Sequence, residues 1–282
     1  MNILLLGKTG QVGFELHRAL SPLGAITAPG REALDLMDEQ AVSNYLAETK
    51  PDLIVNAAAW TAVDAAEEHP ADAARLNADL SAQLAEYVAA NNARLVHYSS
   101  DYVYPGTGEM PWDETSSTGP LSHYGKTKLQ GDQAIEQSGA DYLIFRTSWV
   151  YSARGNNFMK IMLRLSESKA ELNIVADQTG APTPARLIAQ VTVLAIHSRL
   201  ESGLYHLAPT GETSWHGFAE DIFRLAGKNI KANPIPTSEY PTPAKRPVNS
   251  RLDVTKLENA LNIELPDWRS QLIMTLGEYL EN

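Results

Sequence analysis

Residues 3–13 read ILLLGKTGQVG, a short apolar run followed at once by a glycine-rich turn. An apolar run of strand length is typical of a central parallel strand that is covered on both faces. Val12, Leu16 and Leu20 follow at a spacing of four, which predicts an amphipathic helix after the turn. Strand, glycine turn and helix are the context of a dinucleotide-binding loop, with the pyrophosphate at the helix N-terminus. The glycines are spaced G-x-x-G-x-x-G rather than G-x-G-x-x-G, so a purely structural turn remains an alternative.

The alternation of strand and helix continues for about 150 residues. Further strands are expected near 25–28, 53–55, 95–98 and 142–145, and helices over 39–50, 71–91 and 124–138. Strands that alternate with helices form a parallel sheet covered by helices. The predicted fold class is therefore α/β, a doubly wound parallel sheet of Rossmann type, with residues 1–149 as its cofactor-binding domain.

Residues 150–282 differ in composition and carry most of the prolines. Shorter helices and strands with long loops are expected there, which suits a smaller C-terminal domain that is mainly for the substrate. An apolar helix over about 185–197, within a segment near 184–208, is a candidate to pack back onto the sheet.

Composition excludes several classes of protein. The chain has 282 residues, 44% of them hydrophobic, and a net charge of −11, which argues against a nucleic-acid partner. It has no cysteine, which suits a reducing cytosol, and no apolar run approaches the about 20 residues of a membrane span. We therefore expect a cytoplasmic protein that binds neither nucleic acid nor membrane.

The residues after the second expected strand bear on the choice of cofactor. NAD-selective folds carry an acidic residue there for the ribose 2′-hydroxyl, whereas an arginine suits the 2′-phosphate of NADP. Arg31 is the nearest charged side chain of the right kind, and Lys8 in the glycine loop adds a second positive charge. Residues 1–149 are thus predicted to bind NADPH, with NADH possible; the alternative is that both side chains are merely solvated.

Tyr124 and Lys128 lie four residues apart, so one face of a helix carries both. An ammonium beside a phenol stabilises the phenolate and lowers the tyrosine pKa from its usual value of about 10. Such a tyrosine exchanges a proton with a substrate oxygen near neutral pH. The same spacing also occurs by chance on surface helices, so this pair alone is weak evidence.

Taken together with the glycine loop, Ser100, Tyr124 and Lys128 resemble the extended short-chain dehydrogenase/reductase superfamily. Within it, the chain is similar to the dTDP-4-dehydrorhamnose reductase family nearly from end to end. The stretches that carry this similarity are 56–60, 61–64, 99–103, 124–128, 146–150, 177–183 and 246–252. Among them, Asp-Gln-x-Gly-x-Pro-Thr at 177–183 and Arg-Pro-x-Asn-Ser at 246–250 are the most specific.

The resemblance implies NADPH-dependent reduction of the C4 keto group of dTDP-4-dehydro-L-rhamnose, the last step of dTDP-L-rhamnose synthesis. It makes Tyr124 the general acid, Lys128 the residue that lowers its pKa and holds the nicotinamide ribose, and Ser100 a hydroxyl donor to the substrate carbonyl. The implied cofactor contacts are Gly7, Gly10, Gln11, Val12 and Gly13 at the pyrophosphate, Asp35 and Leu36 at the adenine, and Ala57, Ala58 and Trp60 at the middle of the cofactor. The implied substrate contacts are Thr61, Val63, Asp101, Tyr102 and Trp149.

Two other readings stay open. A sugar-nucleotide epimerase or dehydratase of the same superfamily is one, although similar dehydratases place a glutamate where this chain has Tyr102. A non-catalytic, NADP-binding regulatory subunit is the other, although it has no need of the three catalytic groups. Lys245, Arg246 and Arg251 are candidates to hold the substrate diphosphate.

Some members of the family hold magnesium at a dimer interface, with carboxylates at positions that match Glu15, residue 186 and Glu278. Residue 186 is an arginine here, which offers only hydrogen-bond donors and cannot ligate a metal ion. We therefore expect no magnesium, ion pairs from Arg186 to the two glutamates instead, and a homodimer only as a possibility.

Overall fold

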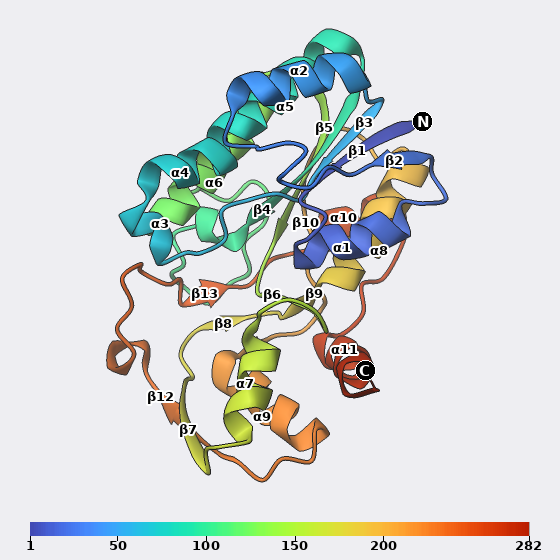
Figure 1. Cartoon of the computed structure of the whole chain (residues 1–282). Coiled ribbons are helices and arrows are strands. Elements are labelled where there is room, and N and C mark those ends of the chain that lie inside the picture. Colours follow the sequence, from blue (N-terminus) through green and yellow to red (C-terminus); the bar gives the residue numbers. More distant parts are fainter. Residues whose placement is uncertain (282) are drawn as a thin grey trace.

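Six parallel strands form the central sheet of the computed structural model, which describes residues 1–281 (Figure 1). Their order is β10-β5-β4-β3-β1-β2, and every neighbouring pair is parallel. The strands are β1 (Asn2–Leu6), β2 (Ala25–Thr27), β3 (Leu53–Asn56), β4 (Arg94–Ser100), β5 (Asp141–Thr147) and β10 (Gly203–His206). The chain leaves β1 toward the β2 edge and then crosses back to β3, which makes a topological switch point between β1 and β3.

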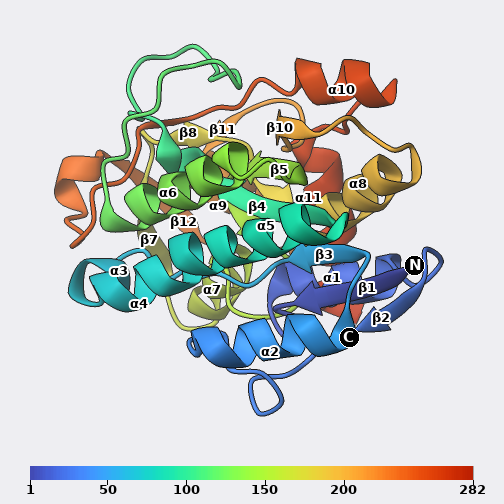
Figure 2. The ribbon, with the colours of Figure 1, turned by 90° about the horizontal axis from the view of Figure 1, so that it is seen from above.

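Helices cover both faces of this sheet. One face packs against α1 (Gln11–Ala19) and α8 (Ala185–His197), and the other against α2 (Glu39–Thr49), α5 (Leu80–Asn91) and α6 (His123–Gln137). Figure 2 shows α5 between α2 and α6. The predicted doubly wound α/β fold is confirmed, because the apolar runs of the strands are buried from both sides.

The C-terminal part of the chain builds a second, smaller unit below the sheet in Figure 1. Its helices α7 (Phe158–Ser166), α9 (Trp215–Leu225) and α11 (Trp268–Glu281) share a core around Phe218 and Trp268. Its strands pair as β7 (Glu171–Val175) with β12 (Lys231–Ile235), β6 (Val150–Tyr151) with β9 (Thr183–Pro184), and β8 (Thr179–Gly180) with both β11 (Thr213–Ser214) and β13 (Asn249–Ser250). The helix α10 (Thr255–Leu261) lies beside β10.

Residues 185–206 return from this unit to the sheet. Helix α8 packs against α1, and β10 extends the sheet beyond β5, with Gly203 opposite Leu143. Apolar side chains of α8, among them Ile188 and Val191, are buried in the same core as Leu5 and Leu16. The sheet is therefore completed by residues from the second half of the chain.

The long helix expected over 71–91 is interrupted. It comprises α4 (Pro70–Ala74), a π-helical turn (Arg75–Asp79) and α5, and it follows the short helix α3 (Ala65–Glu68). In the π turn, Asn77 accepts a hydrogen bond from the backbone N–H of Trp60 at 2.9 Å and donates to Thr127 Oγ1 at 3.1 Å. The wider turn thus joins the loop after β3 to helix α6, and π turns are frequent at functional sites.

Two short 3₁₀ turns, Asp101–Val103 and Thr237–Glu239, complete the regular structure. Helix α6 begins where Ser122 caps it by accepting a hydrogen bond from Gly125 N at 3.2 Å. Within residues 1–281, no helix combines the length and the apolar character that crossing a membrane requires.

Candidate active site

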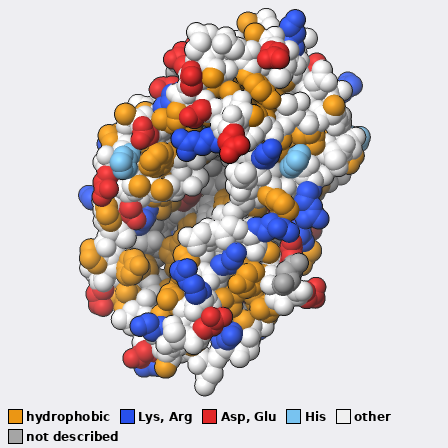
Figure 3. All heavy atoms as spheres, viewed as in Figure 1, with side chains coloured by type: hydrophobic (Ala, Val, Ile, Leu, Met, Phe, Trp, Pro, Cys, Tyr) orange, Lys and Arg blue, Asp and Glu red, His pale blue; other side chains and the backbone are white. Residues whose placement is uncertain are grey.

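A cavity of about 1140 Å³ lies at the carboxyl ends of the sheet strands. Its walls come from the loops after β1, β2, β3, β4 and β5 and, on the other side, from residues of the C-terminal unit such as Asn156 and Trp215. Figure 3 shows a hollow between the two parts of the molecule on this face. This is the position at which open α/β sheets bind their ligands.

The glycine loop brings the ends of β1 and β3 together. Gly7 has a φ of +83°, and a Cβ there would lie 2.6 Å from the backbone of Ala57 and Ala58. Only glycine fits both the left-handed conformation and this close approach. Gly10, Gln11 and Val12 line the cavity, and no side chain caps the start of α1, so the positive end of this helix faces the cavity. These residues fit the pyrophosphate of a dinucleotide.

Gly13 has a different place from the one expected. It is not part of the cavity wall, and a Cβ on Gly13 would lie 2.0 Å from the carbonyl oxygen of Gly7. Gly13 allows α1 to pack closely against the turn, and its neighbours line the cavity. Its expected contact with the pyrophosphate stays a prediction.

The other expected cofactor residues all line the cavity. They are Arg31, Asp35, Leu36, Ala57, Ala58 and Trp60. Arg31 is highly exposed, and its Nη2 lies 3.9 Å from Asp35 Oδ2. An exposed ion pair at this distance contributes little to stability, so the guanidinium is available to an anionic ligand.

Ser100, Tyr124 and Lys128 come together at the cavity wall. Ser100 is the last residue of β4, while Tyr124 and Lys128 occupy successive turns of α6. The Ser100 hydroxyl donates to Asp101 Oδ1 at 3.0 Å and is also hydrogen-bonded to the phenol of Tyr124. Burial raises the pKa of Asp101 to about 6, although its hydrogen bonds oppose this shift.

The expected effect of Lys128 on Tyr124 is not found in this structure. Burial raises the pKa of Tyr124 above its usual value, and the hydrogen bond with Ser100 is the only cause that lowers it. The ammonium of Lys128 is turned to the back of the site, where it donates to the carbonyl oxygen of Tyr98 at 2.6 Å and lies 3.1 Å from His97 Nε2. Desolvation of the phenol therefore sets the direction of the shift, and Lys128 is not among its causes.

The expected substrate residues also line the cavity: Thr61, Val63, Asp101, Tyr102 and Trp149. The ring of Tyr102 meets that of Tyr124 edge to face, with the centroids 5.4 Å apart. Trp149 stacks on Trp215, with the centroids 3.7 Å apart, and has a φ of +49°. A tryptophan rarely adopts this left-handed backbone, and such conformations cluster at functional sites.

The basic residues considered for the diphosphate are paired elsewhere. Arg246 binds Asp64 at 2.6 Å and Arg251 binds Glu212 at 2.5 Å, and neither they nor Lys245 belongs to the cavity wall. Arg246 also contacts Tyr102, which lines the cavity, so a role of these cations at the diphosphate stays a prediction. Carboxylates that were distant in sequence neutralise two of the three positive charges.

The family model described as RmlD substrate binding domain matches residues 1–281. The dTDP-4-dehydrorhamnose reductase of Shigella flexneri is 48% identical, and the alignment covers 99% of this chain and 98% of that protein. The chain belongs to the dTDP-4-dehydrorhamnose reductase family.

Solved structures of the family agree with the fold. The dTDP-4-dehydrorhamnose reductase of Clostridium acetobutylicum superposes with a TM-score of 0.95 at 35% identity, covering 100% of both chains. The dTDP-4-dehydrorhamnose reductase of Bacillus anthracis was solved in complex with NADP; its TM-score is 0.93 at 33% identity, with 98% of this chain and 99% of that chain covered.

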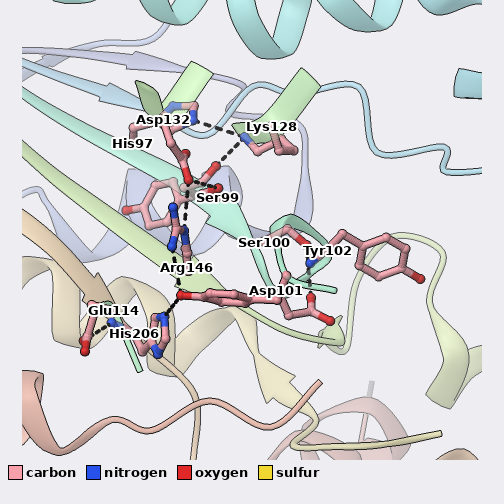
Figure 4. Close-up of polar contacts among 12 residues, drawn as sticks. His97, Ser99, Ser100, Asp101, Tyr102, Glu114, Lys128, Asp132, Arg146 and His206 are labelled. Carbon is pink, nitrogen blue, oxygen red and sulfur yellow. Dashed lines mark hydrogen bonds and ion pairs between the residues drawn. The ribbon is translucent and has the colours of Figure 1, made fainter. Parts of the chain in front are cut away.

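A buried polar network behind the catalytic groups was missed in the sequence. Asp132 accepts hydrogen bonds from Ser99 Oγ at 2.8 Å and Arg146 Nε at 3.0 Å, and Arg146 donates to Tyr104 OH at 2.8 Å (Figure 4). Burial raises the pKa of Asp132, while Arg146 opposes the shift. One signal was available: Asp132 follows Lys128 by four residues, which places both on one face of α6.

Other cavity residues gave no signal of their own. Trp215, Met37 and Asn156 lie on three segments that the sequence did not connect with the glycine loop. Their contribution depends on how the C-terminal unit and the loop after β2 fold over the sheet. Spacing along the chain carries no information about such contacts.

Arg186 on α8 lies between Glu15 on α1 and Glu278 on α11. Its Nε is 3.9 Å from Glu15 Oε2, and its Nη2 pairs with Glu278. The predicted ion pairs are confirmed. A guanidinium has only donors, so these three residues do not fit a magnesium ion, and the described residues contain no cluster of three His, Asp or Glu side chains that could hold a metal.

Proposed function

We propose that the protein reduces the C4 keto group of dTDP-4-dehydro-L-rhamnose with NADPH and yields dTDP-L-rhamnose. The observation that carries this proposal is the convergence of Ser100, Tyr124 and Lys128 on a cavity whose other end is the glycine loop. The activity named for the relatives, at 48% identity over nearly the full length, supports the same reaction. The family member solved with NADP supports the cofactor.

The proposed roles follow from the chemistry of each group. Bound NADPH supplies the hydride that reaches C4. Tyr124 gives its phenolic proton to the substrate oxygen, and its raised pKa keeps that proton in place at neutral pH until it is needed. Ser100 hydrogen-bonds the same oxygen, and the ammonium of Lys128 holds the cofactor ribose.

The cavity is shared between the two ligands in this proposal. Residues 1–149 carry the NADP site, with Arg31 at the 2′-phosphate, and residues 150–282 contribute mainly to the sugar-nucleotide site, apart from the segment 185–206 that completes the sheet. Trp149, which stacks on Trp215, then covers the sugar. A cytoplasmic location belongs to the same proposal, as does a homodimer. The exposed apolar side chains of Ile273 and Met274 on α11 support a contact between two subunits at this helix.

The competing functions have weaker support. An epimerase or dehydratase of this fold is disfavoured by Tyr102, which follows Asp101 where a dehydratase base would stand. A regulatory subunit is disfavoured because the three catalytic side chains are all present and all line one cavity.

One assay separates these possibilities. Purified protein is mixed with NADPH and dTDP-4-dehydro-L-rhamnose, the absorbance of NADPH is followed, and the product is identified by NMR. We expect stoichiometric oxidation of NADPH and formation of dTDP-L-rhamnose. NADPH binding without turnover would indicate a regulatory protein, and conversion of the sugar nucleotide without net NADPH oxidation would indicate an epimerase or dehydratase.

A further inference from the structure

We propose that His97 is a positioning residue that holds the ammonium of Lys128 from the back of the active site. His97 is a residue of β4 that does not line the cavity, so it acts only through the lysine. The inference rests on the proposed function in one respect, the role of Lys128 in holding the cofactor ribose.

The geometry shows a buried contact between the two side chains. Only 1% of His97 and 1% of Lys128 is exposed. The Nζ atom of Lys128 lies 3.1 Å from His97 Nε2 and 2.6 Å from the carbonyl oxygen of Tyr98. Figure 4 shows the imidazole and the ammonium pointing toward each other, away from the side of Ser100 and Tyr102.

An ammonium with so little access to water depends on its acceptors. It has three N–H donors, and in this structure Tyr98 and His97 take two of them. The third remains for the cavity, which Lys128 lines. A buried charge that loses an acceptor becomes costlier and neutralises more readily, so removing His97 should favour the uncharged amine.

The protonation state of His97 agrees with an acceptor role. Burial first, and then the charge of Lys128, lower the pKa of His97 well below its usual value, so the ring is neutral and has one hydrogen. If Nε2 accepts from Lys128, this hydrogen is on Nδ1, which lies 3.3 Å from the amide nitrogen of Asn56. A half turn of that amide presents its oxygen to Nδ1, at the expense of the 3.2 Å bond from Ala58 N to Asn56 Oδ1.

Other groups around Lys128 also affect its pKa. Asp132, one turn further along α6, raises the pKa of Lys128, but burial outweighs it and lowers that pKa to about 8. Arg146 neutralises part of the Asp132 charge, and Tyr124 lies one turn before Lys128. A lysine that titrates this close to neutral pH responds to the loss of a single hydrogen bond.

The first test is made on the unmodified protein. Long-range ¹H–¹⁵N spectra of the histidines distinguish the two neutral tautomers of His97. They are recorded at a pH below the pKa of Lys128, where the lysine is charged. We expect the hydrogen of His97 on Nδ1. A hydrogen on Nε2 would overturn the proposal, because that nitrogen then has no lone pair for the ammonium.

The second test compares His97→Phe, which removes the acceptor, with His97→Gln, which keeps one. The titration of Lys128 is followed with ¹⁵N-labelled lysine, assigned through Lys128→Met, and the affinity for NADPH is measured by fluorescence between pH 6 and about pH 10. In His97→Phe we expect the lysine midpoint to fall by about 1 pH unit. NADPH should then bind about 5-fold more weakly near pH 8, where about half of the wild-type lysine but only about a tenth of the variant lysine is charged. His97→Gln should recover most of the lysine midpoint and most of the affinity for NADPH.

His206→Phe is the matched control. His206 is also fully buried and neutral, with its pKa lowered to about 3, and its Nε2 bonds Tyr104 OH at 2.7 Å. This variant should lose stability without moving the midpoint of Lys128. Equal midpoints in His97→Phe and the wild type would contradict the proposal, as would a failure of His97→Gln to recover. All these measurements use protein and NADPH alone, so absent turnover of the sugar nucleotide would refute only the proposed function.

Discussion

Tyr124 is the residue on which the proposed chemistry depends most directly. Its replacement by phenylalanine removes the proton donor and leaves the glycine loop unchanged. We expect kcat to fall by at least about 100-fold, the usual contribution of a positioned acid, while the affinity for NADPH changes little. Steady-state kinetics and fluorescence titration with NADPH check this, and near-normal turnover in Tyr124→Phe would rule out the mechanism.

Arg31 is the residue expected to distinguish the two nicotinamide cofactors. It lines the cavity, and its exposed ion pair with Asp35 is weak enough to yield to a phosphate. Arg31→Ala should weaken NADPH binding by about 1.5–3 kcal/mol, the range of a hydrogen bond to a charged group, and leave NADH binding nearly unchanged. Calorimetry with each cofactor measures the difference; equal losses would mean that Arg31 supports the fold.

Helix α1 depends on a glycine in a way that helix α11 does not. A Cβ at Gly13 would lie 2.0 Å from Gly7 O, whereas nothing lies within 4 Å of the equivalent position at Gly277. Gly13→Ala should therefore destabilise the protein by about 1–3 kcal/mol, as overpacking does, and weaken NADPH binding by displacing the loop. Gly277→Ala should stabilise it by about 0.5–1 kcal/mol, because alanine favours a helix.

Urea unfolding of both glycine variants measures these effects. The pair is informative because the same methyl group is added to a helix in each case. If Gly13→Ala were as stable as the wild type, then α1 would have room to move away from the turn, and the close packing described for the glycine loop would not be required.

At the scale of the whole molecule, Arg186 connects three helices from distant parts of the chain. It binds Glu15 on α1 and Glu278 on α11, where a magnesium ion would need oxygen ligands at about 2.0–2.1 Å. Removal of divalent metals with EDTA should therefore change neither turnover nor the sedimentation coefficient. Higher salt should weaken this contact, because ion pairs that are partly exposed are screened.

The same experiment is then repeated with added magnesium. Recovery by magnesium of an activity or an assembly that EDTA had removed would show that a metal acts in place of Arg186. Absence of any change in both measurements would leave the three side chains as a purely ionic contact.

The sequence by itself determined the class of fold and the chemistry of the main groups. Apolar runs of three or four residues alternate with amphipathic helices, and this local periodicity has only one common solution, a parallel sheet covered on both faces. The glycine loop, and the spacing of Tyr124 and Lys128, were also readable, because both depend on conformations within a single turn or helix. Arg186 was recognised because it stands where the family resemblance implies a carboxylate.

Only the tertiary structure decided what surrounds these groups. The strand β10 completes the sheet from more than 50 residues beyond β5, and the pairing of Arg246 with Asp64 spans 182 positions. The high pKa of Tyr124 arises from burial, and the ammonium of Lys128 turns toward His97 on a neighbouring strand. Desolvation and long-range pairing depend on which segments pack together, and no local pattern in the sequence encodes that.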